Sequence, residues 1–147
     1  MPVDTAAFRE AHSRLGARVD ELRAGAARLP SLTREERARL RQELLDVLRT
    51  SVEPHTKLDE RLLYPAVADR LGDALVAASM GYDHVAIRHW IGELEAADAD
   101  DVPYLQELLY GLDALIRVHM WKENELFIGA LESSDWPRAA EAVTRSG

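Results

Sequence analysis

The segment His55-Thr56-Lys57-Leu58-Asp59 has a counterpart further along the chain, His119-Met120-Trp121-Lys122-Glu123. In each segment a carboxylate follows an imidazole by four residues, and on an α-helix this spacing places both side chains on one face, one turn apart. Two more histidines, His12 and His84, lie on apolar helical stripes of their own. Because such groups bind metal when they converge, the doubled motif predicts a metal site inside a four-helix bundle.

Apolar residues recur with a helical period along almost the whole chain, without the alternation of apolar and polar residues that strands show. We therefore expect an all-α fold: one four-helix bundle over residues 1–132 and a short C-terminal helical tail over residues 133–147. The expected inner stripes are Phe8, His12, Leu15, Val19, Leu22, Ala26 and Leu29; Leu40, Leu44, Val47, Ser51, His55, Leu58 or Asp59, and Leu62; Ala77, Met80, His84, Ile87, Ile91 and Leu94; and Leu105, Leu108, Leu112, Leu115, His119, Glu123, Leu126 and Ala130.

Caps and prolines predict where the helices begin and end. The second helix is expected to run from a capping box at residues 33–36 to about Tyr64, followed by a turn that contains Pro65 and Gly72. Trp136 is expected to pack the tail against the bundle. The remaining signals are Asp4 as the first cap, Pro30 as the first stop, a loop at residues 98–101, and Asp101 with Pro103 at the start of the fourth helix.

Pro54 is the exception within the second helix. An interior proline removes the backbone hydrogen bond to Thr50 and costs on the order of 3 kcal/mol. One interpretation is that two helices meet near Thr50 and Ser51. The other is a kink that directs His55 toward a functional site, because strain is often retained beside such residues.

Composition narrows the classes of function. The 147-residue chain carries a net charge of −8 and no Lys/Arg block, which argues against a nucleic-acid surface. It contains no cysteine, so thiolate zinc sites, iron–sulfur clusters and a cysteine nucleophile are excluded. No signal-peptide core and no run of about 20 apolar residues is present, so we expect a cytoplasmic protein that does not span a membrane.

The donor types limit the metal. Imidazole and carboxylate suit iron, manganese or zinc, and two bridging carboxylates let two dications share a buried pocket. Ferritin-like di-iron proteins use Glu-x-x-His pairs, and none of the five histidines has a glutamate three residues before it. The His-Glu-x-x-His motif of zinc proteases is also missing.

Three neighbouring residues leave alternatives open. His89 lies five residues after His84, a rotation of about 140° on an ideal helix, so it reaches the site only through a local π-bulge. Glu60 is a second choice to Asp59 as the first acid. Arg88, one turn after His84, is either an edge residue with its guanidinium in water or a catalytic residue that stabilises a bound anion.

The arrangement resembles the hemerythrin-like HHE cation-binding domain family over about residues 4–132. The residues that carry the resemblance are His12, His55-x-x-x-Asp59 followed by Leu63-Tyr64-Pro65, His84 with Ile87-Arg88, and His119-x-x-x-Glu123. The resemblance implies an antiparallel four-helix bundle with two iron ions, Fe²⁺ or Fe³⁺, that are open to an oxo or hydroxo bridge. It implies that one iron is held by His12 and His55, that the other is held by His84 and His119, and that Asp59 and Glu123 bridge them.

Two departures from the family pattern bear on function. Oxygen-carrying hemerythrins have a fifth histidine where this chain has Arg88, and aspartate stands at position 59 where glutamate is usual. The missing histidine should leave one iron less fully coordinated, with room for water or an exogenous molecule. Reversible oxygen carriage is therefore not the expected activity.

Three hypotheses follow. The first, and preferred, is a non-haem di-iron enzyme that reacts with hydrogen peroxide or nitric oxide, catalase-like or nitric-oxide-reducing, with a small gas or peroxide as its partner. The second is a protein that senses or stores dioxygen or nitric oxide without turnover. The third is an interaction module in which the metal only stabilises the bundle. The oligomeric state is left open, as is a mixed iron–manganese pair.

Overall fold

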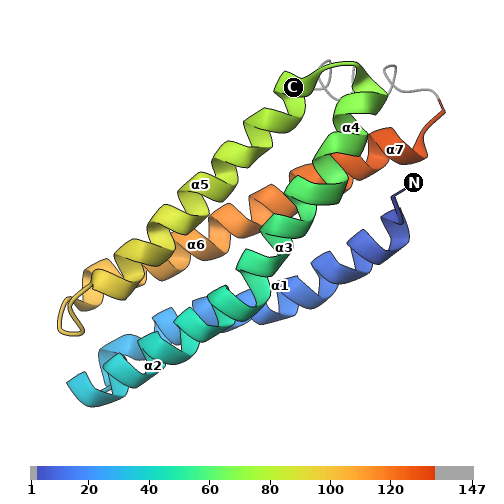
Figure 1. The fold of residues 1–147 in the computed structure, drawn as a ribbon. Coiled ribbons are helices and arrows are strands. Elements are labelled where there is room, and N and C mark those ends of the chain that lie inside the picture. The colour runs from blue at the N-terminus through green and yellow to red at the C-terminus, as the bar shows by residue number, and fades with distance from the viewer. Residues whose placement is uncertain (1–2, 135–147) are drawn as a thin grey trace, which may run out of the picture.

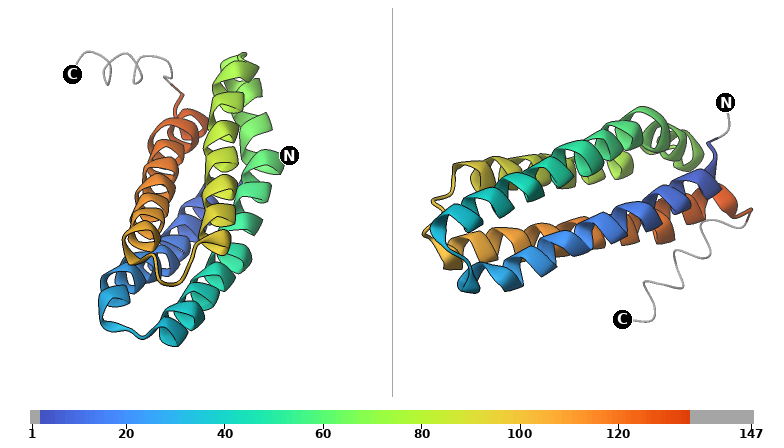
Figure 2. Two further views of the ribbon diagram at one scale, coloured as in Figure 1. Left: turned by 90° about the vertical axis from the view of Figure 1, so that its left-hand side faces the viewer. Right: turned by 90° about the horizontal axis from the view of Figure 1, so that it is seen from below.

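A computed structural model describes residues 3–134, and these residues form four long helical segments with no strand. The third and fourth segments contain α5 and α6, and the views in Figures 1 and 2 show all four lying side by side. The elements are α1 (Thr5–Arg28) and η1 (Leu29–Ser31); α2 (Arg34–Val47), η2 (Leu48–Val52), α3 (Glu53–Leu58), η3 (Asp59–Leu63) and α4 (Tyr64–Leu71); α5 (Ala74–Ala96); and α6 (Val102–Lys122), η4 (Glu123–Ile128) and α7 (Gly129–Glu132). The all-helical prediction is confirmed.

Side-chain caps begin the helices where the sequence predicts them. Asp4 accepts a hydrogen bond from the Ala7 N–H at 2.9 Å, and Thr33 and Glu36 form a reciprocal capping box at the start of α2. Asp101 caps α6 in the same way, as predicted, and Asp73 caps α5, which the sequence did not predict. Each such cap is typically worth about 1 kcal/mol, because it satisfies backbone N–H groups that have no partner inside the helix.

The second segment continues past its predicted end. It runs on through α4 to Leu71 and stops at Gly72, whose φ of 66° lies in the left-handed region that glycine adopts without strain. The expected turn at Pro65 is therefore wrong. Pro65 lies in the first turn of α4, directly after the π-helical η3, where the loss of one N–H is tolerated.

Pro54 lies in the first turn of α3, directly after the π-helical η2. The two elements are continuous, and every cap residue between them has right-handed helical angles. The segment changes direction between α2 and α3 in Figure 1. A π-turn and a proline are both recognised causes of a bend, so the structure agrees with a kink before His55 rather than a break.

The core has two hydrophobic clusters. The larger one lies toward the 29–33 and 97–101 connections and contains Leu15, Val52, Ile87 and Ile116 among its members. The smaller one contains Phe8, Leu63, Tyr64, Val67, Ala77, Met80, Phe127 and Ile128. On each segment the candidate metal ligands fall between residues of the two clusters, so a polar layer crosses the apolar core.

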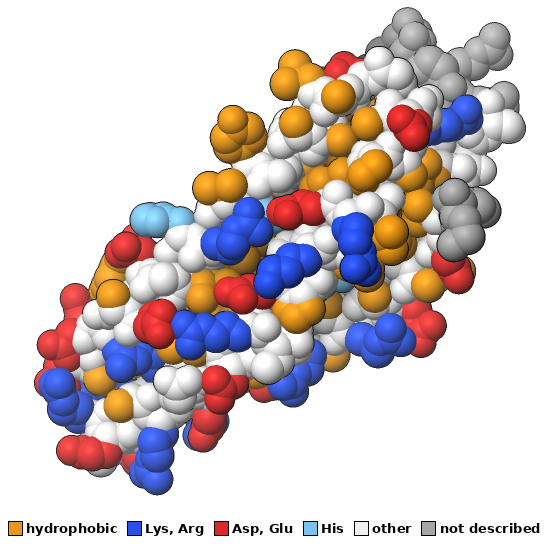
Figure 3. Space-filling model, in the orientation of Figure 1, with side chains coloured by type: hydrophobic (Ala, Val, Ile, Leu, Met, Phe, Trp, Pro, Cys, Tyr) orange, Lys and Arg blue, Asp and Glu red, His pale blue; other side chains and the backbone are white. Residues whose placement is uncertain are grey.

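The surface mixes both signs of charge. Figure 3 shows Lys and Arg side chains interspersed with Asp and Glu on the face it presents, with apolar side chains between them. Ion pairs such as Arg9–Glu132 and Arg49–Glu95 connect segments distant in sequence. None of the helices between residues 3 and 134 has the length and apolar character needed to cross a membrane. The predicted packing of Trp136 lies outside the described residues.

Gly111 offers a test of the packing between α5 and α6. A Cβ atom at Gly111 would overlap the indole ring of Trp90, whereas a Cβ at Gly92, on the exposed side of α5, would meet nothing within 4 Å. We expect Gly111→Ala to lower the free energy of unfolding by about 1–3 kcal/mol through overpacking. Gly92→Ala should be neutral or stabilise by up to about 1 kcal/mol, because alanine favours helix. Urea unfolding of both variants measures this, and equal effects would contradict the close packing of Gly111 against Trp90.

Candidate metal centre

Four histidines enter the polar layer, one from each segment. His12 comes from α1, His55 from α3, His84 from α5 and His119 from α6, and all four are buried. One turn before each histidine stands an apolar core residue, which explains why the imidazoles point inward: Phe8, Val52, Met80 and Ile116. The four sequence-predicted histidines are therefore brought together at one level of the core.

Two carboxylates complete the layer. Asp59 and Glu123 each lie one turn after a histidine, and the exposed fraction of each is 0%. Each is also the first residue of a π-helical stretch, η3 and η4 respectively. Such wider turns are rare and concentrate at functional sites. The sequence predicts the histidine–acid spacing but not these π-turns.

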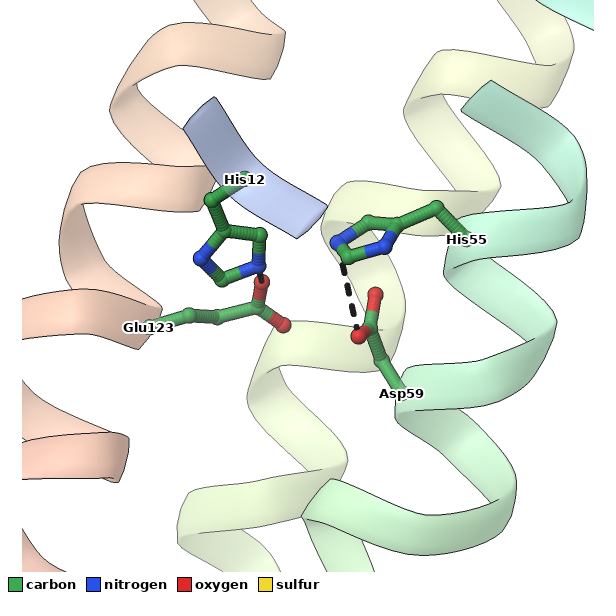
Figure 4. A group of neighbouring side chains, drawn as sticks. All are labelled: His12, His55, Asp59 and Glu123. Carbon is green, nitrogen blue, oxygen red and sulfur yellow. Dashed lines mark ion pairs between the residues drawn. The ribbon is translucent and has the colours of Figure 1, made fainter. Parts of the chain in front are cut away.

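The first group of donors comprises His12, His55, Asp59 and Glu123, and one donor atom from each lies within 4.8 Å of the others. His12 Nε2 is 3.2 Å from Glu123 Oε2, and His55 Nε2 is 3.5 Å from Asp59 Oδ1. Figure 4 shows these side chains pointing toward one another from α1, α3 and the two π-helical stretches. The rings of His12 and His55 meet edge to face at 4.7 Å.

The second group comprises Asp59, His84, His119 and Glu123, again within 4.8 Å of one another. His84 Nε2 lies 2.9 Å from His119 Nε2 and 3.7 Å from Asp59 Oδ2, and His119 Nε2 lies 3.3 Å from Glu123 Oε1. Both carboxylates belong to both groups. Each can therefore offer one oxygen to each of two cations.

Unpartnered atoms test whether these residues fit metal. Five buried side-chain atoms lack a hydrogen-bond partner among the described residues: His12 Nε2, His55 Nε2, Asp59 Oδ1, Asp59 Oδ2 and Glu123 Oε2. Leaving one buried polar atom unpaired costs roughly 1–3 kcal/mol, so proteins seldom keep such atoms without a reason. All five belong to the two donor groups. Nitrogen and oxygen donors gathered in this way fit a pair of divalent or trivalent cations.

In three of the histidines, the ring nitrogen that faces away from the donor groups contacts an oxygen acceptor. The Nδ1 atoms of His12, His84 and His119 lie 2.7 Å from Asn124 Oδ1, 2.8 Å from Glu60 Oε1 and 2.9 Å from Asp83 Oδ2. An Nδ1–H that donates to such an oxygen leaves Nε2 free of hydrogen and facing the layer, which is how metal-binding histidines are usually oriented. Neither Asn124 nor Asp83 was predicted from the sequence, although each is adjacent in sequence to a predicted ligand.

Burial and mutual repulsion set the protonation of the metal-free layer. Burial, together with the charge of Glu123, raises the pKa of Asp59 from 3.8 to about 9. Burial would also raise the pKa of Glu123, but its contacts with His119, His12 and Tyr64 lower it below the ordinary value. Burial and the neighbouring His12 lower the pKa of His55 to about 4. Without metal, the layer therefore disfavours the ionised form of Asp59 and the protonated form of His55.

Both donor groups exclude the three residues whose roles the sequence leaves open: Glu60, His89 and Arg88. Glu60 accepts from His84 Nδ1, and it is Asp59 that belongs to the donor groups. His89 is exposed, and α5 is α-helical throughout, so no π-bulge turns it inward. The Arg88 side chain is 43% exposed and its Nη1 lies 3.4 Å from Glu60 Oε1. Its guanidinium therefore faces Glu60 rather than the space between the donors, because Glu60 lies on the outer side of His84.

Comparison with known proteins agrees with this geometry. The fold and site define a helical protein with a His/carboxylate cation site in its core. The pattern of the Hemerythrin HHE cation binding domain family matches residues 3–131, and the chain belongs to this family. Neither the curated proteins nor the solved structures gave a significant match.

The raised pKa of Asp59 predicts a pH-dependent stability of the metal-free protein. Above pH 4 the unfolded chain releases this proton, whereas the folded chain keeps it until about pH 9. The contribution of Asp59 to stability should therefore fall as pH rises between these values, by up to about 1.4 kcal/mol per pH unit. Urea unfolding of the metal-free wild type and Asp59→Asn at pH 5–8 measures the difference, which should grow with pH in favour of the variant.

The matched control is Glu60→Gln, which removes the neighbouring carboxylate. The Glu60 side chain is 42% exposed, and its pKa is lowered through its contacts with His84 and Arg88, although burial opposes this shift. Its contribution to stability is therefore already complete above its ordinary pKa. The free energy of unfolding of the control should change with pH as it does in the wild type. If Asp59→Asn also shows this pH dependence, Asp59 is not an unpaired buried acid.

Proposed function

We propose that the chain is an antiparallel four-helix bundle that binds two iron ions in the polar layer and uses them to react with a small oxidant or gas, foremost hydrogen peroxide. The observation that carries the proposal is the pair of buried donor groups that share Asp59 and Glu123. Membership of a cation-binding family supports it. A cytoplasmic location is part of the same proposal.

In this proposal His12 and His55 hold one iron, His84 and His119 hold the other, and Asp59 and Glu123 lie between them. When bound, the irons supply Lewis-acid polarisation of a substrate oxygen and exchange of electrons. The side chains fix the positions of the donors and exclude bulk water, because the hydrophobic clusters above and below the layer are closely packed.

Access favours the first group as the place where a small molecule binds. His55 lines a surface pocket of about 190 Å³ beside α1, and His12 lines one of about 280 Å³ beside α6. In the described chain this group gathers four side-chain donors, as the second group does, and iron commonly uses six positions. A peroxide or a diatomic molecule is small enough to use the remaining space.

We prefer hydrogen peroxide as the substrate because its conversion to dioxygen and water needs no other reactant. One peroxide loses two electrons and two protons to become dioxygen, and a second gains them to become two molecules of water. Reduction of nitric oxide needs an external electron donor. The proposed activity is therefore catalase-like, with nitric oxide and dioxygen as the other candidate ligands.

Dioxygen release from peroxide by iron-loaded protein tests this function. His84→Ala removes a ligand of 0% exposure, whereas His89→Ala removes an exposed histidine from the same helix. We expect His84→Ala to lose about 100-fold or more of the rate, since even the loss of a residue that supports a ligand commonly costs 10–100-fold. His89→Ala should stay within about two-fold of the wild type. An oxygen electrode measures both.

Other outcomes separate the remaining hypotheses. If iron-loaded protein releases no dioxygen but its visible spectrum changes with nitric oxide or dioxygen, the sensing or storage hypothesis replaces the turnover hypothesis. Loaded protein that responds to none of the three would leave the metal a structural part of an interaction module.

A further inference from the structure

The position of Tyr64 follows from the π-helical stretch that precedes it. Its N–H donates to Asp59 O, a hydrogen bond that spans five residues. In an α-helix a separation of five residues turns a side chain by about 140° from the first, but the wider π-turn advances each residue by a smaller angle and brings the two side chains toward the same face. Tyr64 therefore lies above Asp59 and points into the polar layer.

The Tyr64 hydroxyl reaches the second donor group. It donates to Glu123 Oε1 at 2.8 Å, and its oxygen lies 3.0 Å from His84 Nε2 and 3.4 Å from His119 Nε2. A hydroxyl has one proton to donate, so at most one of these three contacts uses it. The oxygen thus stands among donors in the way that another ligand would.

The distances fit a shared cation better than a set of hydrogen bonds. Metal–nitrogen and metal–oxygen bonds of about 2.1 Å at right angles place neighbouring donor atoms about 3 Å apart. The two imidazole Nε2 atoms of this group are 2.9 Å apart, and Tyr64 Oη lies 2.8–3.4 Å from its three neighbours. Imidazole nitrogens that face each other this closely compete for a single proton, whereas one cation accepts both.

The ring of Tyr64 is rigidly placed, so little side-chain entropy is left to lose on binding. The residue is 7% exposed. Its ring stacks on His84 at 5.4 Å with an interplanar angle of 20° and meets Phe127 edge to face at 5.7 Å. Leu63 and Val67 belong to the same cluster. These contacts hold the oxygen at the layer without help from solvent.

On the basis of the proposed metal centre, we propose that the phenol oxygen of Tyr64 is a protein ligand of the second metal, alongside His84, His119, Asp59 and Glu123. The metal–oxygen bond forms as the phenol O–H bond breaks, and the proton leaves to the buffer. Tyr64 takes the role that a fifth histidine has in oxygen carriers, which this chain replaces with Arg88. The second metal then has five side-chain donors against four at the first, so the first keeps more room for a small molecule.

Visible absorption and resonance Raman spectra of ferric-loaded protein test the ligand. A phenolate bound to Fe³⁺ gives a charge-transfer band and enhanced tyrosinate ring modes, which imidazole and carboxylate ligands do not. We expect both in the wild type and their complete loss in Tyr64→Phe. Tyr82→Phe, which removes an exposed hydroxyl from α5, is the matched control and should keep both signals.

A second variant keeps the test decisive if Tyr64→Phe folds poorly. The chain has four tyrosines, so the triple variant Tyr82→Phe, Tyr104→Phe, Tyr110→Phe retains Tyr64 alone and should keep the full signal. Iron content is measured on the same samples. Wild type with two irons and no tyrosinate modes would overturn Tyr64 as a ligand while the metal centre stands. Wild type that holds no iron would overturn the metal centre and the ligand together.

Discussion

A layer of six nitrogen- and oxygen-bearing side chains, buried across all four segments, is the constraint on which the rest of the structure depends. Asp59 and Glu123 are fully buried, and five atoms of the layer have no hydrogen-bond partner among the described residues. At roughly 1–3 kcal/mol for each unpaired atom, the layer lowers the stability of the metal-free chain. The apolar clusters on its two sides, with the helix caps, have to offset that cost.

The three π-helical stretches between residues 3 and 134 adapt ordinary helices to this constraint. Two begin at the carboxylates, and the third directly precedes the helical turn that carries Pro54 and His55. A wider turn advances each residue by a smaller angle, so side chains five apart share a face. This shift places Tyr64 beside Asp59. It also makes the two donor groups unequal, because the hydroxyl contacts both histidines of the second group.

Much of the fold and the candidate ligands was predictable from the sequence. Helical periodicity, the capping box at Thr33 and the cap at Asp101 are local signals, and the structure has these features in place. The spacing from His55 to Asp59 is equally local. The continuation of the helix through Pro65 was not predictable, because it depends on a π-turn that residue types do not specify. Asp83 and Asn124 were missed because each acts across to another helix, and only packing reveals those contacts.

The number of irons bound per chain, measured by elemental analysis after anaerobic loading with ferrous iron and removal of the excess, tests the central claim most directly. We expect close to two, because the two donor groups share their carboxylates and neither is complete alone. A value near zero after loading would contradict it and would leave the histidines as packing residues of the core.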